Sequence, residues 1–143
     1  MGAKATSGYS GTPLAKKLGI KEGSAIRLVQ PPETYFSYFQ YFPEEIRFVE
    51  NNKEKVHFIH YFPKNVDTLQ VELPALREQL VQDGMIWISW PKKSAQKQTD
   101  LSGNTVRQIG LRYGLVDVKV CSVNEIWSAL KFVIPVKDRV KHS

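Results

Sequence analysis

Short apolar runs of strand length alternate along the chain with longer segments that carry apolar residues at helical spacing. The strand-like runs cover residues 25–29, 46–49, 56–62, 85–90, 116–123 and 126–134. The helix-like segments cover residues 12–19, 65–82 and 102–113. Strands that alternate with helices form mainly parallel sheets, and two strands joined by a short turn form an antiparallel hairpin. The pattern predicts an α/β domain with a mostly parallel sheet, helices on both faces and a C-terminal antiparallel hairpin.

The register of that hairpin follows from the alternation of its side chains around a turn at residues 124–125. Side chains that face each other across an antiparallel pair lie on the same side of the sheet. This matching places Asp117 opposite Lys131 and Lys119 opposite Ala129. We therefore expect a cross-strand ion pair between Asp117 and Lys131.

The segment 33–42 is unusually aromatic. Its six rings are Tyr35, Phe36, Tyr38, Phe39, Tyr41 and Phe42. On an α-helix they would cover an arc of roughly 220°, which is wider than the apolar arc that packs on one sheet face. One interpretation is an aromatic-rich core helix. The other is that surplus rings at Tyr38, Tyr41 or Phe42 line a homodimer contact or a ligand groove.

Size and composition predict one globular domain. The 143 residues include 42% hydrophobic and 24% charged side chains, which is ordinary for such a domain. No apolar stretch approaches the ~20 residues that span a bilayer, and the first residues have no apolar core of a secretory signal. The single cysteine, Cys121, cannot form an internal disulfide. We expect a cytoplasmic protein with a domain over residues 1–136 and a basic tail over 137–143.

Positive charge is concentrated at the two ends of the chain. The formal net charge is +6, and residues 85–143 carry ten basic and four acidic side chains. Residues 31–84 carry five basic and nine acidic side chains. A basic balance favours anionic partners such as nucleic acid. A solvated basic surface without such a partner is the alternative interpretation, and the one that we favour.

The familiar catalytic and metal-binding patterns are missing. His57 and His60 are three residues apart on a strand, so they face opposite sides of the sheet and cannot share a metal ion. With one cysteine, no zinc site is expected. The sequence contains neither a P-loop nor a Gly-x-Ser-x-Gly elbow. We therefore assign no catalytic residue, no metal and no cofactor from the sequence.

From Val56 to Pro135 the order of elements resembles the C-terminal half of class I methyltransferases. The residues that carry this likeness are 73–84, the strand 85–90 and the closing hairpin. The resemblance implies a Rossmann-like, methyltransferase-like fold in truncated form. It would normally imply S-adenosylmethionine as the cofactor.

A second resemblance covers nearly the whole chain and concerns a small bacterial family of unknown function. Its motifs are GYSGTPLAKKLGI at residues 8–20, WPKK at 90–93, TDL at 99–101, GLVD at 114–117, KVC at 119–121 and WSALKF at 127–132. This family implies no activity for the chain.

The turn after the first strand departs from nucleotide-binding domains. Such domains place glycines there, so that the backbone approaches the phosphates closely and free amides bind them. Here the turn is Gln30-Pro31-Pro32, and the two prolines lack amide donors. Glu50, 20 residues after Gln30, occupies the place of a ribose-binding carboxylate. The turn argues against S-adenosylmethionine or NAD, whereas Glu50 argues for a nucleotide.

Ligands of open α/β sheets bind beyond the carboxyl ends of the strands. The loop 91–101 leaves a central strand at that end. Its candidate binding residues, together with the residue before it, are Trp90, Lys92, Lys93, Lys97, Thr99 and Asp100. They could bind a phosphate or a nucleic-acid backbone. Alternatively, the loop is solvated and Thr99 or Asp100 caps the next helix.

Three functions follow from these features. The favoured hypothesis is a non-enzymatic or regulatory binding domain on a degenerate methyltransferase-like fold, because of the proline turn. The first alternative is an atypical methyltransferase-like enzyme that uses Glu50 and the segment Trp90–Lys93. The second alternative is a nucleic-acid-associated protein, because of the charge distribution.

Overall fold

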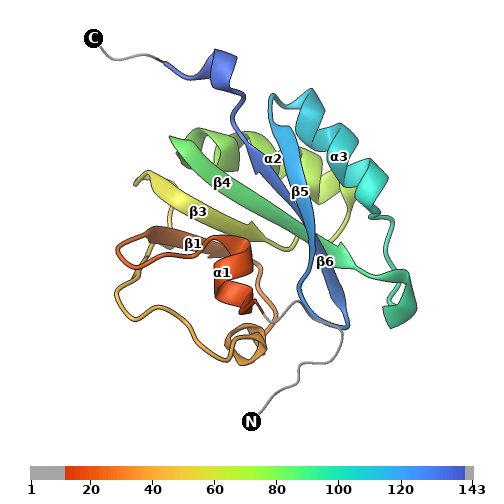
Figure 1. The fold of residues 1–143 in the computed structure, drawn as a ribbon. Helices are drawn as coiled ribbons and strands as arrows, with labels where there is room; N and C mark the ends of the chain where they lie inside the picture. Colours follow the sequence, from red (N-terminus) through yellow and green to blue (C-terminus); the bar gives the residue numbers. More distant parts are fainter. Residues whose placement is uncertain (1–11, 141–143) are drawn as a thin grey trace.

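The computed structural model describes residues 12–140, and a six-stranded sheet runs through its centre (Figure 1). The strands are β1 (Ala25–Val29), β2 (Arg47–Phe48), β3 (Val56–Tyr61), β4 (Leu80–Pro91), β5 (Val116–Ser122) and β6 (Trp127–Val133). The α-helices are α1 (Leu14–Leu18), α2 (Val66–Gln79) and α3 (Gly103–Arg112). Three 3-10 turns are η1 (Tyr35–Tyr38), η2 (Lys93–Ala95) and η3 (Val136–Asp138).

The strand order is β2-β1-β3-β4-β6-β5. The strands β1 to β4 are parallel to one another, and β6 is antiparallel to both β4 and β5. The expectation of a mostly parallel sheet with a C-terminal antiparallel hairpin is therefore confirmed. Because β1, β3 and β4 run in the same direction, their carboxyl ends meet at one edge of the sheet.

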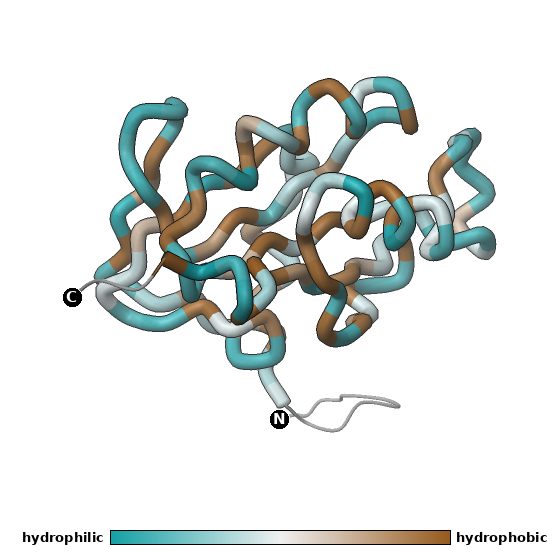
Figure 2. The backbone as a smooth tube through the Cα atoms, turned by 90° about the horizontal axis from the view of Figure 1, so that it is seen from above, coloured by the Kyte–Doolittle hydropathy of each residue, from teal (hydrophilic) through white to brown (hydrophobic). Residues whose placement is uncertain are grey.

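Helices cover both faces of the sheet, as the pattern predicts. α2 and α3 lie on one face, where their apolar residues pack on Ile59, Ile86 and Phe132. α1 lies on the other face together with the aromatic segment, and the Trp87 Nε1–H donates a 2.8 Å hydrogen bond to the Leu18 carbonyl. Figure 2 shows the hydrophobic positions gathered in the middle of the molecule and the hydrophilic ones in the outer loops.

Local sequence signals explain where the two longer helices begin. The Asn65 side chain accepts a 2.8 Å hydrogen bond from the Thr68 amide at the start of α2. The Ser102 side chain accepts a 3.2 Å hydrogen bond from the Thr105 amide at the start of α3. Such N-caps satisfy amides that have no partner within the helix. Neither Thr99 nor Asp100 caps α3.

The aromatic segment does not form the expected helix. Only Tyr35–Tyr38 is helical, as a single 3-10 turn, and residues 39–42 form no helix. The rings pack on each other instead. The ring of Tyr35 contacts five others, those of Phe36, Tyr38, Phe39, His60 and Phe62. Aromatic residues are weak helix formers. Since an irregular segment lets more rings reach one another than a straight helix would, tertiary packing decides the conformation.

The predicted hairpin register is also wrong. Lys119 lies opposite Lys131, Asp117 lies opposite Phe132, and the ladder shifts by one residue between them. A bulge of this kind puts an extra residue into one strand, so side chains beyond it change face. Asp117 therefore points to the face covered by α2 and α3, where it forms an ion pair with Arg107 of α3 at 3.2 Å. It does not pair with Lys131.

The predicted boundary at residue 136 lies within the last described turn, Val136–Asp138, and Arg139 donates a 3.0 Å bond back to the Ile134 carbonyl. The division into a domain and a basic tail stays a prediction. Within residues 12–140, no helix has both the length and the apolar character that crossing a membrane requires.

Candidate functional site

A pocket of about 290 Å³ opens at the edge where the parallel strands end. It receives residues that follow β1, β3 and β4, and also the first residue of β6, which pairs with the last residue of β4. Its lining residues are Gln30, Pro32, Phe62, Pro63, Lys64, Pro91, Lys97, Gln98, Thr99 and Trp127. We call it the edge pocket. Its volume is at the small end of the range for ligand sites.

The turn after β1 forms one wall of the edge pocket. Gln30 has a φ of +58°, in the left-handed region where glycine is favoured. A glutamine in this conformation is strained, and strained residues cluster at functional sites. Pro31 and Pro32 follow it and have no amide hydrogen. The backbone turns here as a glycine would allow, but without the amide donors of a phosphate-binding loop.

Phe62, at the end of β3, forms a second wall, and a buried polar chain supports it. The ring of His60 stacks on Phe62 at 4.4 Å between centroids. His60 Nδ1 lies 2.9 Å from the Tyr35 hydroxyl, and its Nε2 lies 2.8 Å from the Ser89 hydroxyl. All three polar side chains are buried. Burial lowers the pKa of His60 to about 3, so the ring is neutral at physiological pH.

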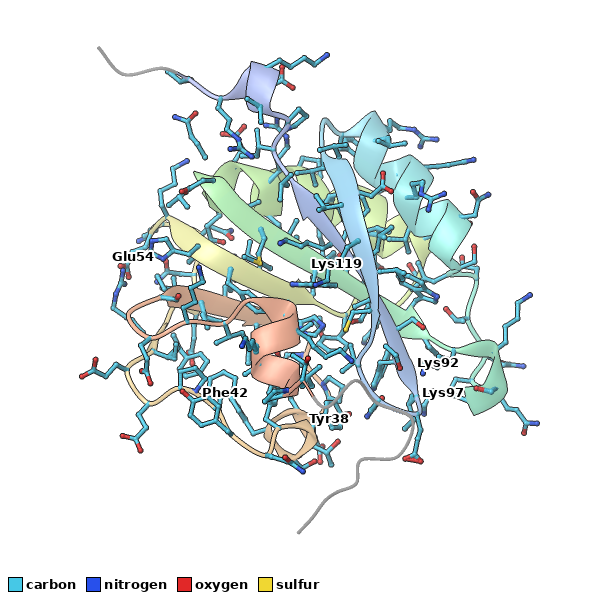
Figure 3. The ribbon with its side chains drawn as sticks, viewed as in Figure 1. Tyr38, Phe42, Glu54, Lys92, Lys97 and Lys119 are labelled. Atoms are coloured by element: carbon cyan, nitrogen blue, oxygen red, sulfur yellow. The ribbon has the colours of Figure 1, made fainter. Side chains whose placement is uncertain are left out.

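Trp127 forms a third, aromatic wall, with its ring edge-on to Phe62 at 5.1 Å. The pocket is also lined by the two exposed lysines Lys64 and Lys97 and by no acidic side chain. Figure 3 shows Lys97 close to the tip of the β5–β6 hairpin. The aromatic walls suit a planar molecule. The two ammonium groups at the rim favour one that carries negative charge.

The predicted loop residues divide between pocket and scaffold. Thr99 lines the edge pocket, and its hydroxyl accepts a 3.0 Å bond from the Leu101 amide. The Lys92 ammonium turns to the hairpin and donates a 2.6 Å bond to Ser122. The Asp100 carboxylate accepts a 3.0 Å bond from the Val66 amide, so it holds the first residue of α2.

The other predicted binding residues lie outside the pocket. Trp90 is half-buried and packs on the first residue of α3, where a Cβ at Gly103 would lie 3.1 Å from its ring. Lys93 begins the exposed turn η2. Glu50 is exposed two residues after β2 and does not line the edge pocket. The structure thus does not bring Glu50 and the segment Trp90–Lys93 together at the pocket.

The predicted interaction residues of the aromatic segment differ in exposure. Tyr38 and Phe42 are half-buried against the core on the α1 face (Figure 3). Tyr41 is 55% exposed, and its hydroxyl lies 3.4 Å from a Glu22 carboxylate oxygen. Tyr41 also lines a second pocket of about 270 Å³ beside α1. Aromatic surface therefore does remain outside the core, chiefly at Tyr41 and Phe36.

Cys121 is buried, and burial raises the pKa of its thiol, which donates to the Ser122 carbonyl at 3.3 Å. A protonated, buried thiol is a poor nucleophile. Across the described part of the chain, no three His, Cys, Asp or Glu side chains gather in a way that could hold a metal ion.

Sequence reasoning missed Gln98 within the predicted loop, and it missed the pocket residues from other parts of the chain, chiefly Phe62, Lys64 and Trp127. One signal could have found Phe62 and Lys64, because residues 62–64 directly follow a strand of the parallel sheet. No sequence signal places Trp127 there, since its position depends on the pairing of β6 with β4.

Comparison with solved structures identifies the fold. A TehB-like S-adenosylmethionine-dependent methyltransferase from Corynebacterium glutamicum matches 85% of this chain and 85% of its own, with a TM-score of 0.52 and 12% identity. A precorrin-6y C5,15-methyltransferase from Geobacter metallireducens matches 85% and 86%, with a TM-score of 0.57 and 8% identity. The N-methyltransferase NodS from Bradyrhizobium japonicum matches 85% and 92%, with a TM-score of 0.57 and 8% identity.

The chain therefore has the α/β Rossmann-like fold of methyltransferases, as expected. No model of a known protein family matches the sequence, and no functionally characterised protein matches it significantly. The resemblance to a small bacterial family of unknown function stays a prediction.

These neighbours correct the favoured hypothesis of a domain without enzymatic activity. Six of the matching solved structures are named as methyltransferases or methylases. The proline turn led the sequence interpretation away from an enzyme. The fold that surrounds that turn is nevertheless shared with these enzymes over most of the chain.

Proposed function

We propose that the chain is an atypical methyltransferase-like enzyme whose active site is the edge pocket. The observation that carries this proposal is the location of the pocket. It lies at the carboxyl ends of β1, β3 and β4, which is where open α/β sheets bind their ligands. The fold around it matches methyltransferases over 85% of the chain. Fold alone does not specify activity, so the site residues must supply the rest of the argument.

The residues present do not fit S-adenosylmethionine in the way that a glycine loop would bind it. Pro31 and Pro32 remove two amide donors from the turn after β1. Glu50, the candidate ribose ligand, lies outside the edge pocket. No acidic side chain lines the pocket to face a sulfonium, and Lys64 and Lys97 would repel it. We therefore derive no reaction step through this cofactor.

The pocket residues fit a small planar anion as the substrate. Phe62 and Trp127 line the pocket with rings that are perpendicular to each other, and such apolar ring surface suits a flat molecule. Lys64 and Lys97 are exposed at the rim, where an ammonium can reach a carboxylate or a phosphate. The Thr99 hydroxyl, which accepts from the Leu101 amide, keeps its own hydrogen for a ligand oxygen.

Two measurements test the proposal. The first follows the amide NMR signals of Lys64, Gln98 and Thr99 during titration with S-adenosylmethionine and with S-adenosylhomocysteine. We expect shifts at these residues with a Kd weaker than about 10 μM, or about −7 kcal/mol, because the amide donors are missing. The second follows radiolabelled methyl transfer from S-adenosylmethionine to a panel of aromatic carboxylates.

Charge variants give these measurements their control. Since S-adenosylmethionine carries a net positive charge, K64Q/K97Q should bind it more tightly and should transfer label to carboxylates at least about tenfold more slowly. K53Q removes a lysine outside the pocket and should change neither. Two negative results together would refute the proposal. The pocket signals would not shift at millimolar S-adenosylmethionine, and no acceptor would receive label.

A further inference from the structure

Three lysines, Lys21, Lys119 and Lys131, gather on the sheet face that carries α1, and we call them the lysine cluster. Lys119 on β5 lies directly opposite Lys131 on β6. Lys131 in turn lies opposite Trp87 on β4, whose ring reaches α1 on this face. Lys21 follows α1 by three residues and lies near enough to Lys131 to lower its pKa.

The charges of the lysine cluster are not compensated. Within residues 12–140, none of the three ammonium groups forms an ion pair or a hydrogen bond. Partial burial, Lys119 and Lys21 all lower the pKa of Lys131, and no carboxylate opposes them. Like charges directly opposite each other across two strands destabilise the pair. The chain therefore keeps a repulsive arrangement that an opposite-charge pair at the same register would remove.

The cluster is open to solvent. Lys119 is exposed, and in Figure 3 its side chain lies over β5 and β6, beside α1 and not beneath it. The helices α2 and α3 occupy the other face. Lys92 extends the positive field toward the hairpin tip, since it and Lys119 both act on the pKa of Cys121. A ligand can thus approach the cluster without any rearrangement of the described core.

We propose that Lys21, Lys119 and Lys131 form a binding site for phosphate groups. Each lysine supplies up to three N–H donors and no acceptor, which excludes cationic ligands. Two ammonium groups on neighbouring strands lie within the reach of one dianion, because opposed Cβ atoms are only about 5 Å apart. A bound phosphate would convert their mutual repulsion into two charge-assisted hydrogen bonds. This site is separate from the edge pocket and does not depend on the proposed enzymatic activity.

The phosphate could belong to a small molecule or to a nucleic-acid backbone, and two probes distinguish these sources. Sodium pyrophosphate, titrated calorimetrically into the whole chain, represents the small ligand. A fluorescein-labelled 12-nucleotide thymidine oligomer, followed by anisotropy at 50 to 200 mM NaCl, represents the backbone. The test variant is K119Q/K131Q. The matched control is K53Q/K137Q, which removes the same charge from exposed positions elsewhere.

We expect K119Q/K131Q to weaken at least one of the two probes about tenfold or more, the value of one charge-assisted hydrogen bond. The control should change either affinity less than about twofold. A response to pyrophosphate alone assigns a small phosphorylated ligand. A response to the oligomer, with the salt dependence of log K reduced by about 1.4 for two lost contacts, assigns the backbone.

The charge-conserving variant K119R/K131R keeps binding if charge is what matters, and circular dichroism reports whether each variant is folded. If the wild-type chain binds neither probe, or if the test and control variants lose affinity equally, the proposal is wrong. Loss of label transfer in K64Q/K97Q would bear on the edge pocket alone, so the two proposals fail independently.

Discussion

The Tyr35 hydroxyl lies 2.9 Å from Nδ1 of His60, and this bond ties the aromatic segment to the middle of the sheet. The other ring nitrogen of His60 lies 2.8 Å from the Ser89 hydroxyl on β4. All three side chains are buried. A single chain of two hydrogen bonds thus connects η1, β3 and β4 beneath the Phe62 wall of the edge pocket.

Tyr35→Phe should destabilise the protein by about 1–3 kcal/mol, because it leaves His60 Nδ1 buried without a partner. The control is Tyr38→Phe, whose hydroxyl lies 3.0 Å from Thr34 in an exposed pair. It should change stability by less than about 0.5 kcal/mol. Urea unfolding, followed by tryptophan fluorescence, measures both. Equal effects of the two substitutions would show that the buried bond contributes nothing.

The same histidine predicts how stability depends on pH. The pKa of His60 is about 3 in the folded protein and 6.5 in a free side chain, and burial is the cause. Between these values the unfolded chain binds a proton that the folded chain does not. Stability is therefore fully present above pH 6.5 and falls as pH drops toward 3, by up to about 1.4 kcal/mol per pH unit.

The check is the NMR titration of the His60 ring in the folded protein, together with urea unfolding at pH 4 to 7. The ring signals should stay those of neutral imidazole down to at least pH 4. In His60→Asn the unfolded chain binds one proton fewer, so the free energy of unfolding should change less steeply with pH, by up to about 1.4 kcal/mol per pH unit. A folded-state titration of His60 near pH 6.5 would contradict the prediction.

These contacts show what the sequence could and could not predict. Alternation of apolar and polar positions is a local property, so most strands and the two longer helices lie close to their predicted bounds. The exception is β4, which begins at Leu80 and not at residue 85, so that residues 80–82 are strand where a helix is predicted. The packing of Tyr35 on His60 joins residues 25 positions apart and leaves no local trace. The helix expected over 33–42 failed because its rings contact each other and β3, which periodicity alone does not describe.

The sequence predicts the edge of the sheet at which the pocket opens better than it predicts the residues that line the pocket. The edge pocket lies at the carboxyl end of the central strand, where the sequence places its candidate loop, and Thr99 lines it. Lys92 and Asp100 are instead engaged by Ser122 and by the Val66 amide, and these partners come from distant parts of the chain. The hairpin register failed for a related reason, since the bulge between Asp117 and Lys119 changes which face each side chain takes.

Gly110→Ala should destabilise the protein, although alanine in a helix interior usually adds about 1 kcal/mol of stability over glycine. A Cβ at Gly110 would lie 2.2 Å from Cε2 of the buried Phe132 ring. Overpacking of this kind costs about 1–3 kcal/mol. Chemical unfolding of the variant gives the size of the effect.

Two further variants identify its cause. Gln108→Ala, at an exposed position of the same helix, should change stability by less than about 0.5 kcal/mol. Adding Phe132→Leu to Gly110→Ala should recover part of the loss, because the smaller side chain makes room for the methyl group. A stabilised Gly110→Ala variant would show that the contact between α3 and β6 is looser than described.

The last prediction concerns an exposed aromatic patch, formed by Phe36, Phe42 and Phe48. Phe36 contacts both other rings edge-on at 5.3 and 5.9 Å, and Phe42 and Phe48 stack at 6.1 Å. Phe36 and Phe48 remain 52% and 44% exposed. Phe48 belongs to β2, the outermost strand, so the patch borders an unpaired sheet edge. Exposed apolar patches beside such an edge are typical of association surfaces.

We expect the chain to self-associate through this patch, and light scattering over a range of protein concentrations measures the association. Phe36→Glu and Phe48→Glu should each shift the protein toward the monomer, because burial of a carboxylate in the contact would remove its hydration at a cost in free energy. Val71→Glu is the matched control, since Val71 is 78% exposed on α2, on the opposite face of the sheet. If the wild-type chain is monomeric at every concentration, the patch is not a self-association surface. The exposed rings then serve only to hold the segment 33–42 against β2, through the contacts of Phe36 and Phe42 with Phe48.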